Sequence, residues 1–145
     1  NKLIHLLAAE FDQKLNMILK QTILTVTDKS GLNCIKVFQL YGGFWRKFTK
    51  LGFYIKGSCR KIKPKNFKNK TIVHKKLFKK GHIIRALLTR QSYNLNRKDG
   101  CVVRVKYNTS ITIKKKKIPL SKYILGPGLI DLKKKKFLSL FHYKF

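Results

Sequence analysis

The side chains of this sequence that could do chemistry are mostly cations. Lysine and arginine together number 35, against 5 aspartate and glutamate residues, so the formal net charge is +30 at pH 7. A chain with so large an excess of one charge repels itself unless a polyanion lies against it. The charge favours nucleic acid over the other common polyanion, an anionic membrane surface. We expect no membrane partner, and no apolar run approaches the roughly 20 residues of a membrane-spanning helix.

The type of cation indicates what is contacted. Arginine occurs at only six positions, so lysine supplies most of the charge. A lysine ammonium is a point charge that suits phosphate, whereas the planar fork of arginine is the usual reader of guanine edges. The balance predicts contacts to phosphates and to nucleic-acid shape rather than to base sequence. The cations that we expect at this interface are Arg46, Lys47, Lys50, Arg60, Lys63, Lys65, Lys68, Lys79, Lys80, Arg90, Arg97, Lys98 and Arg104.

Acids, histidines and cysteines do not form the patterns of an enzyme or a metal site. The aspartates at 28, 99 and 131 fall at predicted turns or caps, and no Cys/His pair has the spacing of a nucleophile and its base. Cys34, Cys59 and Cys101 lie far apart, which predicts neither a disulfide framework nor a zinc site. We interpret them as small buried apolar residues in a reducing compartment. We therefore expect no catalytic activity, no metal and no cofactor.

Two segments concentrate the cations. Residues 44–50 interleave Phe44, Trp45 and Phe48 with cations, a mixture that suits stacking on bases or riboses beside phosphate contacts. The alternative is that Trp45 and Phe48 cap one end of a barrel. Residues 63–80 are basic and poorly periodic, which predicts either a loop ordered by RNA phosphates or a solvated loop.

Short β-strands must position these cations. Their signals are β-branched density and period-two alternation between Gly, Asp and Pro turns. Val103, Val105 and Tyr107 alternate with Arg104 and Lys106, which predicts a barrel wall between residues 101 and 107. The turn at Asp99-Gly100 should reverse the chain before it, with Arg97 and Lys98 at the tip. The strands that we expect span residues 18–27, 34–40, 53–62, 82–90, 101–107 and 110–113.

The predicted fold class is mainly β: a small five- to six-stranded β-barrel with a short C-terminal helical segment and an appended N-terminal helix. Apolar residues recur at every fourth position from Leu3 to Leu15, which predicts a helix in residues 1–16. This helix should dock on protein, with a membrane surface as the alternative. Gly126-Pro127 places proline where a C-terminal helix could begin. We divide the chain into a helical extension, 1–16, and a barrel domain with C-terminal helices, 17–145.

In order and spacing, several short motifs resemble the L-fourteen family of the large ribosomal subunit. The resemblance covers residues 17 to about 141, and Val105 departs from it where the family usually has Phe or Tyr in the core. The matching motifs are Met17-Ile-Leu-Lys-Gln-Thr22, Cys34-Ile35-Lys36-Val37, Gly42-Gly43, Lys79-Lys80-Gly81, Ala86-Leu87-Leu88, Asp99-Gly100 and Gly126-Pro127.

The resemblance implies a small β-barrel bound to large-subunit rRNA near the subunit interface, so the cations above become expected rRNA contacts. It implies neighbours of the L-three and L-nineteen families and a bridge to small-subunit rRNA. It also implies a docking surface for a silencing factor that blocks subunit joining. The bridge or docking residues that we expect are Lys122, Tyr123, Lys133 and Lys136.

The composition is rich in Lys, Ile, Phe and Asn, which adenine- and thymine-rich codons specify. We therefore expect a mitochondrial ribosome in the matrix, with a plastid ribosome as the alternative. The alternative function is a free basic RNA-binding barrel protein that acts as a translation or RNA-processing factor.

Overall fold

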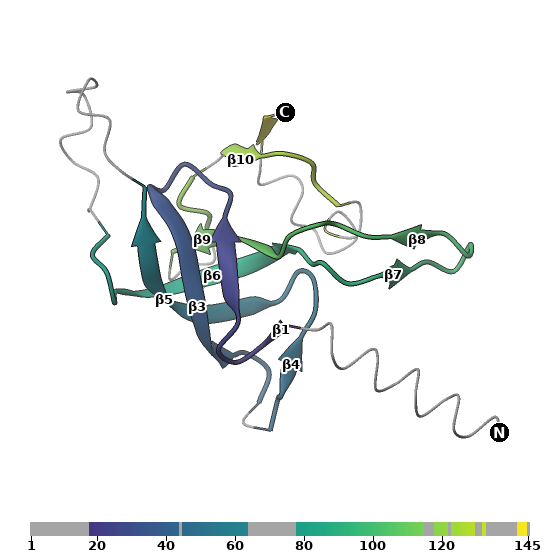
Figure 1. The fold of residues 1–145 in the computed structure, drawn as a ribbon, viewed down its shortest axis with the longest axis horizontal. Helices are drawn as coiled ribbons and strands as arrows, with labels where there is room; N and C mark the ends of the chain where they lie inside the picture. Colours follow the sequence, from purple (N-terminus) through teal and green to yellow (C-terminus); the bar gives the residue numbers. More distant parts are fainter. Residues whose placement is uncertain are drawn as a thin grey trace.

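Five strands of the chain form a closed barrel (Figure 1). The computed structural model describes residues 18–43, 45–63, 78–114, 118–121, 123–129, 132 and 142–144. The barrel confirms the predicted fold class, whereas the predicted helix at residues 1–16 lies outside the described residues. In spatial order, the barrel strands are β2 (Ile23–Val26), β3 (Leu32–Leu40), β5 (Tyr54–Ile62), β6 (Ile83–Arg90) and β9 (Thr109–Ile113).

The barrel closes through a parallel pair between its first and last strands. β2 pairs with β9 through Thr25↔Thr109 and Val26↔Ser110, while the other neighbours in the barrel are antiparallel. Closure gives every barrel strand a partner on both sides, so none of these strands is a free sheet edge. The strands predicted at residues 34–40, 53–62, 82–90 and 110–113 are confirmed to within two residues at each end.

One predicted strand is divided. Residues 18–27 form β1 (Ile18–Leu19) and β2, because the chain turns at Lys20 and Gln21. Gln21 has a φ of 75°, the only positive value at a described residue other than glycine. β1, which precedes the break, pairs antiparallel with β4 (Phe48–Thr49). These two strands form a small sheet beside the barrel (Figure 1).

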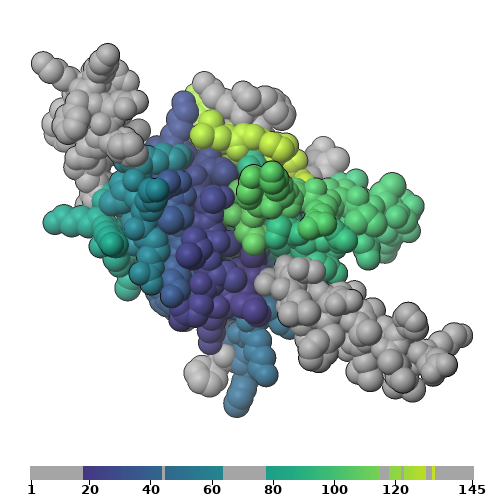
Figure 2. Space-filling model, viewed as in Figure 1, coloured from purple at the N-terminus to yellow at the C-terminus, as the bar shows by residue number. Residues whose placement is uncertain are grey.

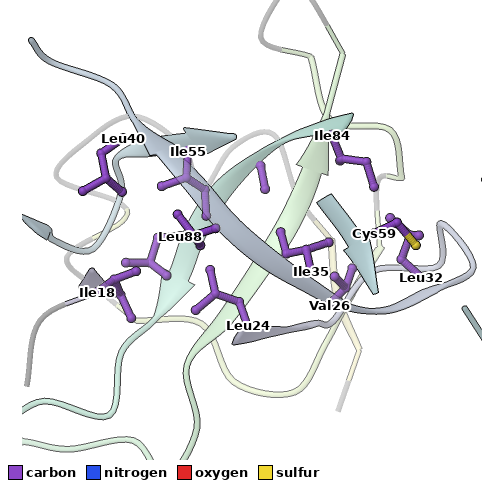
Figure 3. Packing of buried hydrophobic residues seen from close by; sticks show 12 residues of the cluster. Ile18, Leu24, Val26, Leu32, Ile35, Leu40, Ile55, Cys59, Ile84 and Leu88 are labelled. Carbon is purple, nitrogen blue, oxygen red and sulfur yellow. The ribbon is translucent and has the colours of Figure 1, made fainter. Parts of the chain in front are cut away.

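The barrel interior is filled by alternate residues of its strands (Figure 3). The largest cluster of buried side chains gathers apolar residues from β1, β2, β3, β5 and β6. Gly57 in β5 allows the close approach that a glycine inside a strand predicts: an added Cβ would lie 2.9 Å from the backbone oxygen of Lys36. The members of the cluster are Ile18, Leu24, Val26, Leu32, Ile35, Val37, Leu40, Ile55, Cys59, Ile84, Ala86 and Leu88.

The prediction that residues 101–107 form a barrel wall is wrong. Only β8 (Val102–Val103) is paired there, and its partner is β7 (Leu95–Asn96) rather than a barrel strand. Residues 91–108, which we call the arm, extend away from the barrel (Figure 1). Val102 is 57% exposed and Tyr107 59%, while Val105 is half-buried and lies outside the barrel core. The alternation of apolar and cationic residues misled the prediction. It indicates that an extended segment has one apolar and one polar face, but it does not indicate which part of the protein covers the apolar face.

The C-terminal region adds a pairing that the sequence did not predict. β10 (Tyr123–Leu125) pairs in parallel with β11 (His142–Lys144). Residues 127–129 have no regular secondary structure, so no helix begins at Pro127. Leu132 is helical and buried, and the rest of the predicted C-terminal helical segment lies outside the described residues. None of the described residues belongs to a helix long and apolar enough to cross a membrane.

Candidate nucleic-acid interface

The described surface carries almost no negative charge. Of the 5 acidic residues, Asp28 and Asp99 are described. Asp28 is only 1% exposed, so Asp99 at the tip of the arm is the one exposed carboxylate among the described residues. Elsewhere on this part of the surface, no carboxylate of a described residue is available to neutralise the cations. An external polyanion is therefore the natural counterion.

The carboxylate of Asp28 is used inside the fold. It accepts hydrogen bonds from the backbone N–H of Thr112 at 2.7 Å and from the Thr112 hydroxyl at 2.5 Å. It also accepts from the backbone N–H of Ser30 at 3.0 Å and from the Ser30 hydroxyl. Asp28 further makes an isolated bridge with Ile124 in β10. One buried acid thus ties the turn after β2 to β9 and lies against β10, while its charge stays away from the surface.

The outer face of the barrel carries cations that the sequence analysis missed. Lys56 in β5 lies directly opposite Arg85 in β6, and Lys36 in β3 lies opposite Ser58. Their neighbours along each strand are buried, so these four side chains face outward. Arg60, which the sequence analysis did include, is exposed on the same face of β5. We call Lys36, Lys56, Arg60 and Arg85 the wall cations; only the strand register, which the sequence does not supply, shows that they belong together.

The arm presents a second set of cations. Its turn is confirmed: Gly100 has a φ of 81°, and the backbone N–H of Arg97 donates to the carbonyl of Cys101 at 2.9 Å. Lys98 and Arg104 are exposed, and Arg97 is half-buried. The space-filling view shows the arm projecting well beyond the barrel (Figure 2). The arm can therefore place its cations at a distance from those of the wall.

The segment with interleaved rings and cations splits into inward and outward side chains. The Arg46 guanidinium donates to the carbonyl of Tyr41 at 3.0 Å and to that of Phe48 at 3.1 Å, and lies 4.2 Å from the centre of the Phe53 ring. These contacts assign Arg46 to the support of its own loop. Trp45 is 86% exposed, so it does not cap the barrel. Lys47 and Lys50 are exposed as well, which keeps them available to a phosphate.

Arg90, another predicted contact, lies inside the protein. It is 8% exposed, and its guanidinium donates to the carbonyl of Pro127 at 2.7 Å and to that of Leu125 at 2.5 Å. Gly126, between them, has a φ of 83°, and an added Cβ would lie 2.9 Å from an Arg90 nitrogen. Arg90 therefore fastens the C-terminal segment to β6, and its burial leaves little of its surface for a phosphate.

The remaining predicted contacts are divided. Lys79 and Lys80 are exposed at the turn before β6, where Gly81 has a φ of 85° and donates its N–H to the carbonyl of Cys59 at 2.9 Å. Lys63 is half-buried and donates to the backbone carbonyl of Asp28 at 3.4 Å. Lys65 and Lys68 lie outside the described residues, as does most of the loop predicted at residues 63–80.

Of the predicted bridge or docking residues, only Tyr123 is described. It is 42% exposed, and the Lys29 ammonium lies 5.2 Å from the centre of its ring. The segment around it also exposes apolar side chains, a feature that the sequence analysis missed: Ile118, Leu120 and Leu125. Lys122, Lys133 and Lys136 lie outside the described residues.

The cysteines fill different environments. Cys59 is buried as predicted, Cys34 is half-buried, and the prediction is wrong for Cys101, which is exposed on the arm. Burial raises the pKa of the Cys59 thiol, with a smaller contribution from Cys34, and burial also raises the pKa of Tyr54. No group of three or more His, Cys, Asp or Glu side chains with the arrangement of a metal site occurs within the described ranges.

Comparison with known protein families identifies a match over most of the chain. The model of the family described as Ribosomal protein L14p/L23e matches residues 17–143. The match includes every strand of the barrel and the whole arm, and it extends into β11. It covers the whole of the region in which the sequence motifs showed the resemblance.

Proposed function

Because this chain belongs to the Ribosomal protein L14p/L23e family, we propose that it holds large-subunit rRNA against two cationic surfaces, the wall cations and the arm. The family consists of structural proteins of the large ribosomal subunit that bind rRNA, and it is not a family of enzymes. The chain therefore acts by binding, through the surfaces on which its cations are exposed.

The wall cations carry this proposal. Lys56 and Arg85 are opposite each other across β5 and β6, and Arg60 is on the same outward face. A rigid barrel keeps such side chains at fixed separations, so a folded RNA can meet several of them together without first ordering a loop. The near absence of surface carboxylates on the described residues leaves rRNA phosphates as the counterions. Contacts of this kind position RNA by its backbone and shape.

A salt titration tests the wall. Replacing all four wall cations with glutamine should lower the affinity for an rRNA fragment and flatten the dependence of affinity on salt. The log–log slope should change by up to about 0.9 for each phosphate that is no longer neutralised on a duplex-like site, and by less on single strands. The matched control, Arg60→Lys with Arg85→Lys, keeps the charges and should keep the slope. An unchanged slope in the glutamine variant would remove the wall from the interface.

The same titration applied to Lys79, Lys80, Arg97 and Lys98 tests the turn before β6 and the arm. Three of these side chains are exposed and Arg97 is half-buried. Neutralising the four should again weaken rRNA binding and flatten its salt dependence. A wild-type slope in this variant would remove these four residues from the interface.

The proposal extends to the subunit interface and to protein neighbours. The resemblance implies a bridge to small-subunit rRNA, neighbours of the L-three and L-nineteen families, and docking of a silencing factor. The apolar surface at Ile118, Leu120, Tyr123 and Leu125 supports a protein neighbour, since phosphate contacts need no such surface. Chemical crosslinking of intact large subunits, read by mass spectrometry at Lys114 and Lys122, should join this region to one of those proteins. Crosslinks only within this chain would count against the proposed neighbours.

The proposed location is the mitochondrial ribosome, with the plastid ribosome as the alternative. This proposal is supported by a composition rich in residues that adenine- and thymine-rich codons specify. In sucrose gradients of mitochondrial lysate, the chain should sediment with large subunits and stay with them through a moderate-salt wash. Release at moderate salt would favour the free RNA-binding factor, which the family match does not favour. Recovery with plastid subunits instead would exclude the mitochondrial location.

A further inference from the structure

We propose that Trp45 and the two lysines beside it form a stacking site for one unpaired nucleotide of RNA. The inference rests on the proposed function, because it requires RNA at this surface. The inference adds a ligand that phosphate neutralisation does not require, namely a base that is not paired in a duplex.

The site is an open hollow at the junction of β1 and the loop before β4. Its volume is about 360 Å³, and its lining residues are Leu19, Lys20, Trp45, Arg46 and Lys47. Trp45 is 86% exposed and Leu19 40%, so the ring and the aliphatic side chain give the hollow an apolar surface open to solvent. Lys20 and Lys47, both exposed, also line the hollow, and no carboxylate of the described residues lines it.

The loop that carries Trp45 is stabilised by the contacts of the next residue, Arg46. Arg46 bonds to the carbonyls of Tyr41 and Phe48 and covers the Phe53 ring at 4.2 Å, so the residue after Trp45 is fixed at both ends of its guanidinium. Gly42 has a φ of 108°, and an added Cβ there would collide with the Arg46 guanidinium. The exposed ring therefore stands on a preorganised loop, which lowers the entropy cost of binding.

An unpaired nucleotide suits this hollow better than a duplex does. The bases of a duplex are stacked on one another and present only their edges and backbone, whereas an unpaired base offers its face to an aromatic ring. A base stacked on the indole would leave its flanking phosphates near Lys20 and Lys47. The alternative occupant of the hollow is an apolar side chain of a neighbouring protein, and the test must distinguish it from an unpaired nucleotide.

The fluorescence of this chain reports on the site directly, because Trp45 is its only tryptophan. The full chain is titrated with an oligouridylate of about ten nucleotides, within the usual range of single-strand site sizes, and with an RNA duplex carrying a similar number of phosphates. Binding of both is followed by the anisotropy of labelled RNA. We expect the single strand to quench the tryptophan strongly and the duplex to bind with little quenching.

Variants separate stacking from charge. Trp45→Ala should weaken single-strand binding roughly 5- to 150-fold, the loss expected for one base stacked on an aromatic ring, and should leave the salt slope unchanged. Trp45→Phe should restore most of the affinity because it restores a ring. The matched control is Ile118→Ala, which removes an exposed apolar side chain from the surface assigned to a protein neighbour and should have no effect on RNA binding. Circular dichroism checks that each variant keeps the barrel.

Each outcome decides between the two proposals. Single-strand binding with a normal salt slope, no quenching and wild-type affinity in Trp45→Ala would overturn the stacking site, leave the proposed function standing, and point to a protein side chain in the hollow. Equal quenching by the duplex would overturn the preference for an unpaired base. If neither RNA bound the full chain, the proposed function would fail first, and the stacking site with it.

Discussion

Replacing Asp28 with alanine should lower the free energy of unfolding by about 4 kcal/mol. The substitution leaves the buried N–H of Thr112 without its acceptor at 2.7 Å, and an unsatisfied buried donor costs about 1–3 kcal/mol. It also removes the charge-assisted bond from the Thr112 hydroxyl at 2.5 Å, and such bonds contribute about 1.5–3 kcal/mol. Ser30 is only half-buried, so water can replace much of its share.

The measurement is urea unfolding of the full chain, followed by circular dichroism at a salt concentration that screens the self-repulsion of the cations. The Asp28→Asn variant keeps the shape and one acceptor oxygen but turns an amide N–H₂ toward a donor, and we expect about half the loss. Thr112→Val removes only the hydroxyl and should cost about 1–2 kcal/mol. The double variant, Asp28→Ala with Thr112→Val, should be less destabilised than the sum of the two single variants.

A loss below about 1 kcal/mol in Asp28→Ala, with an unchanged dependence on urea, would refute the reasoning. Such a small loss would mean that water hydrates Thr112 once the carboxylate is removed. The contact between the turn after β2 and β9 would then be accessible to solvent rather than buried. Additive effects in the double variant would likewise show that Asp28 and Thr112 act separately.

Other parts of the fold can be tested by single substitutions and by the reactivity of the cysteines. Gly57→Ala should destabilise the barrel by about 1–3 kcal/mol in urea unfolding, because its Cβ would lie 2.9 Å from the Lys36 carbonyl oxygen; no change would mean that β3 and β5 separate freely. Arg90→Met should speed proteolysis after residue 120 while the barrel stays folded, since two carbonyls lose their donor; wild-type cleavage would show that the C-terminal segment is held by other contacts. Cys101 should react with a maleimide far faster than Cys59, whose burial raises its pKa, and equal rates would contradict the buried position. Stability should also fall as the pH rises above about 8.5, because the unfolded chain releases the Cys59 proton before the folded one does, and a Cys59→Val variant should lack this part of the decline.

The sequence predicted the barrel well because its strands are encoded locally. β-branched residues, alternation and turn residues lie within a few positions of one another, so β3, β5, β6 and β9 could be located within two residues. The Asp99-Gly100 turn and the close approach at Gly57 were predictable for the same reason: each depends on a property of the glycine itself.

The rest depends on partners far along the chain. Val103 and Val105 alternate like wall residues, yet nothing in their pattern says that they lie on an arm instead of a barrel. Arg90 looks like a surface cation until carbonyls 35 and 37 residues later take its donors. Lys56 and Arg85 become one surface only through the register of β5 with β6. The cationic character of the candidate site could therefore be predicted from the sequence, but which cations share a surface could not.

The way the barrel closes has a consequence for its synthesis. The seam between β2 and β9 joins Thr25 to Thr109, and the Asp28–Thr112 contact beside it spans 84 positions of the chain. On the ribosome that makes this protein, the N-terminal strands emerge first and keep an open edge until β9 has been translated, which takes several seconds at about 5–20 residues per second. During that interval, a strongly cationic, unsealed sheet stands close to the RNA of its own translating ribosome. We expect nascent chains truncated before residue 109 to be markedly more prone to aggregation and RNA adhesion than chains that extend past residue 113.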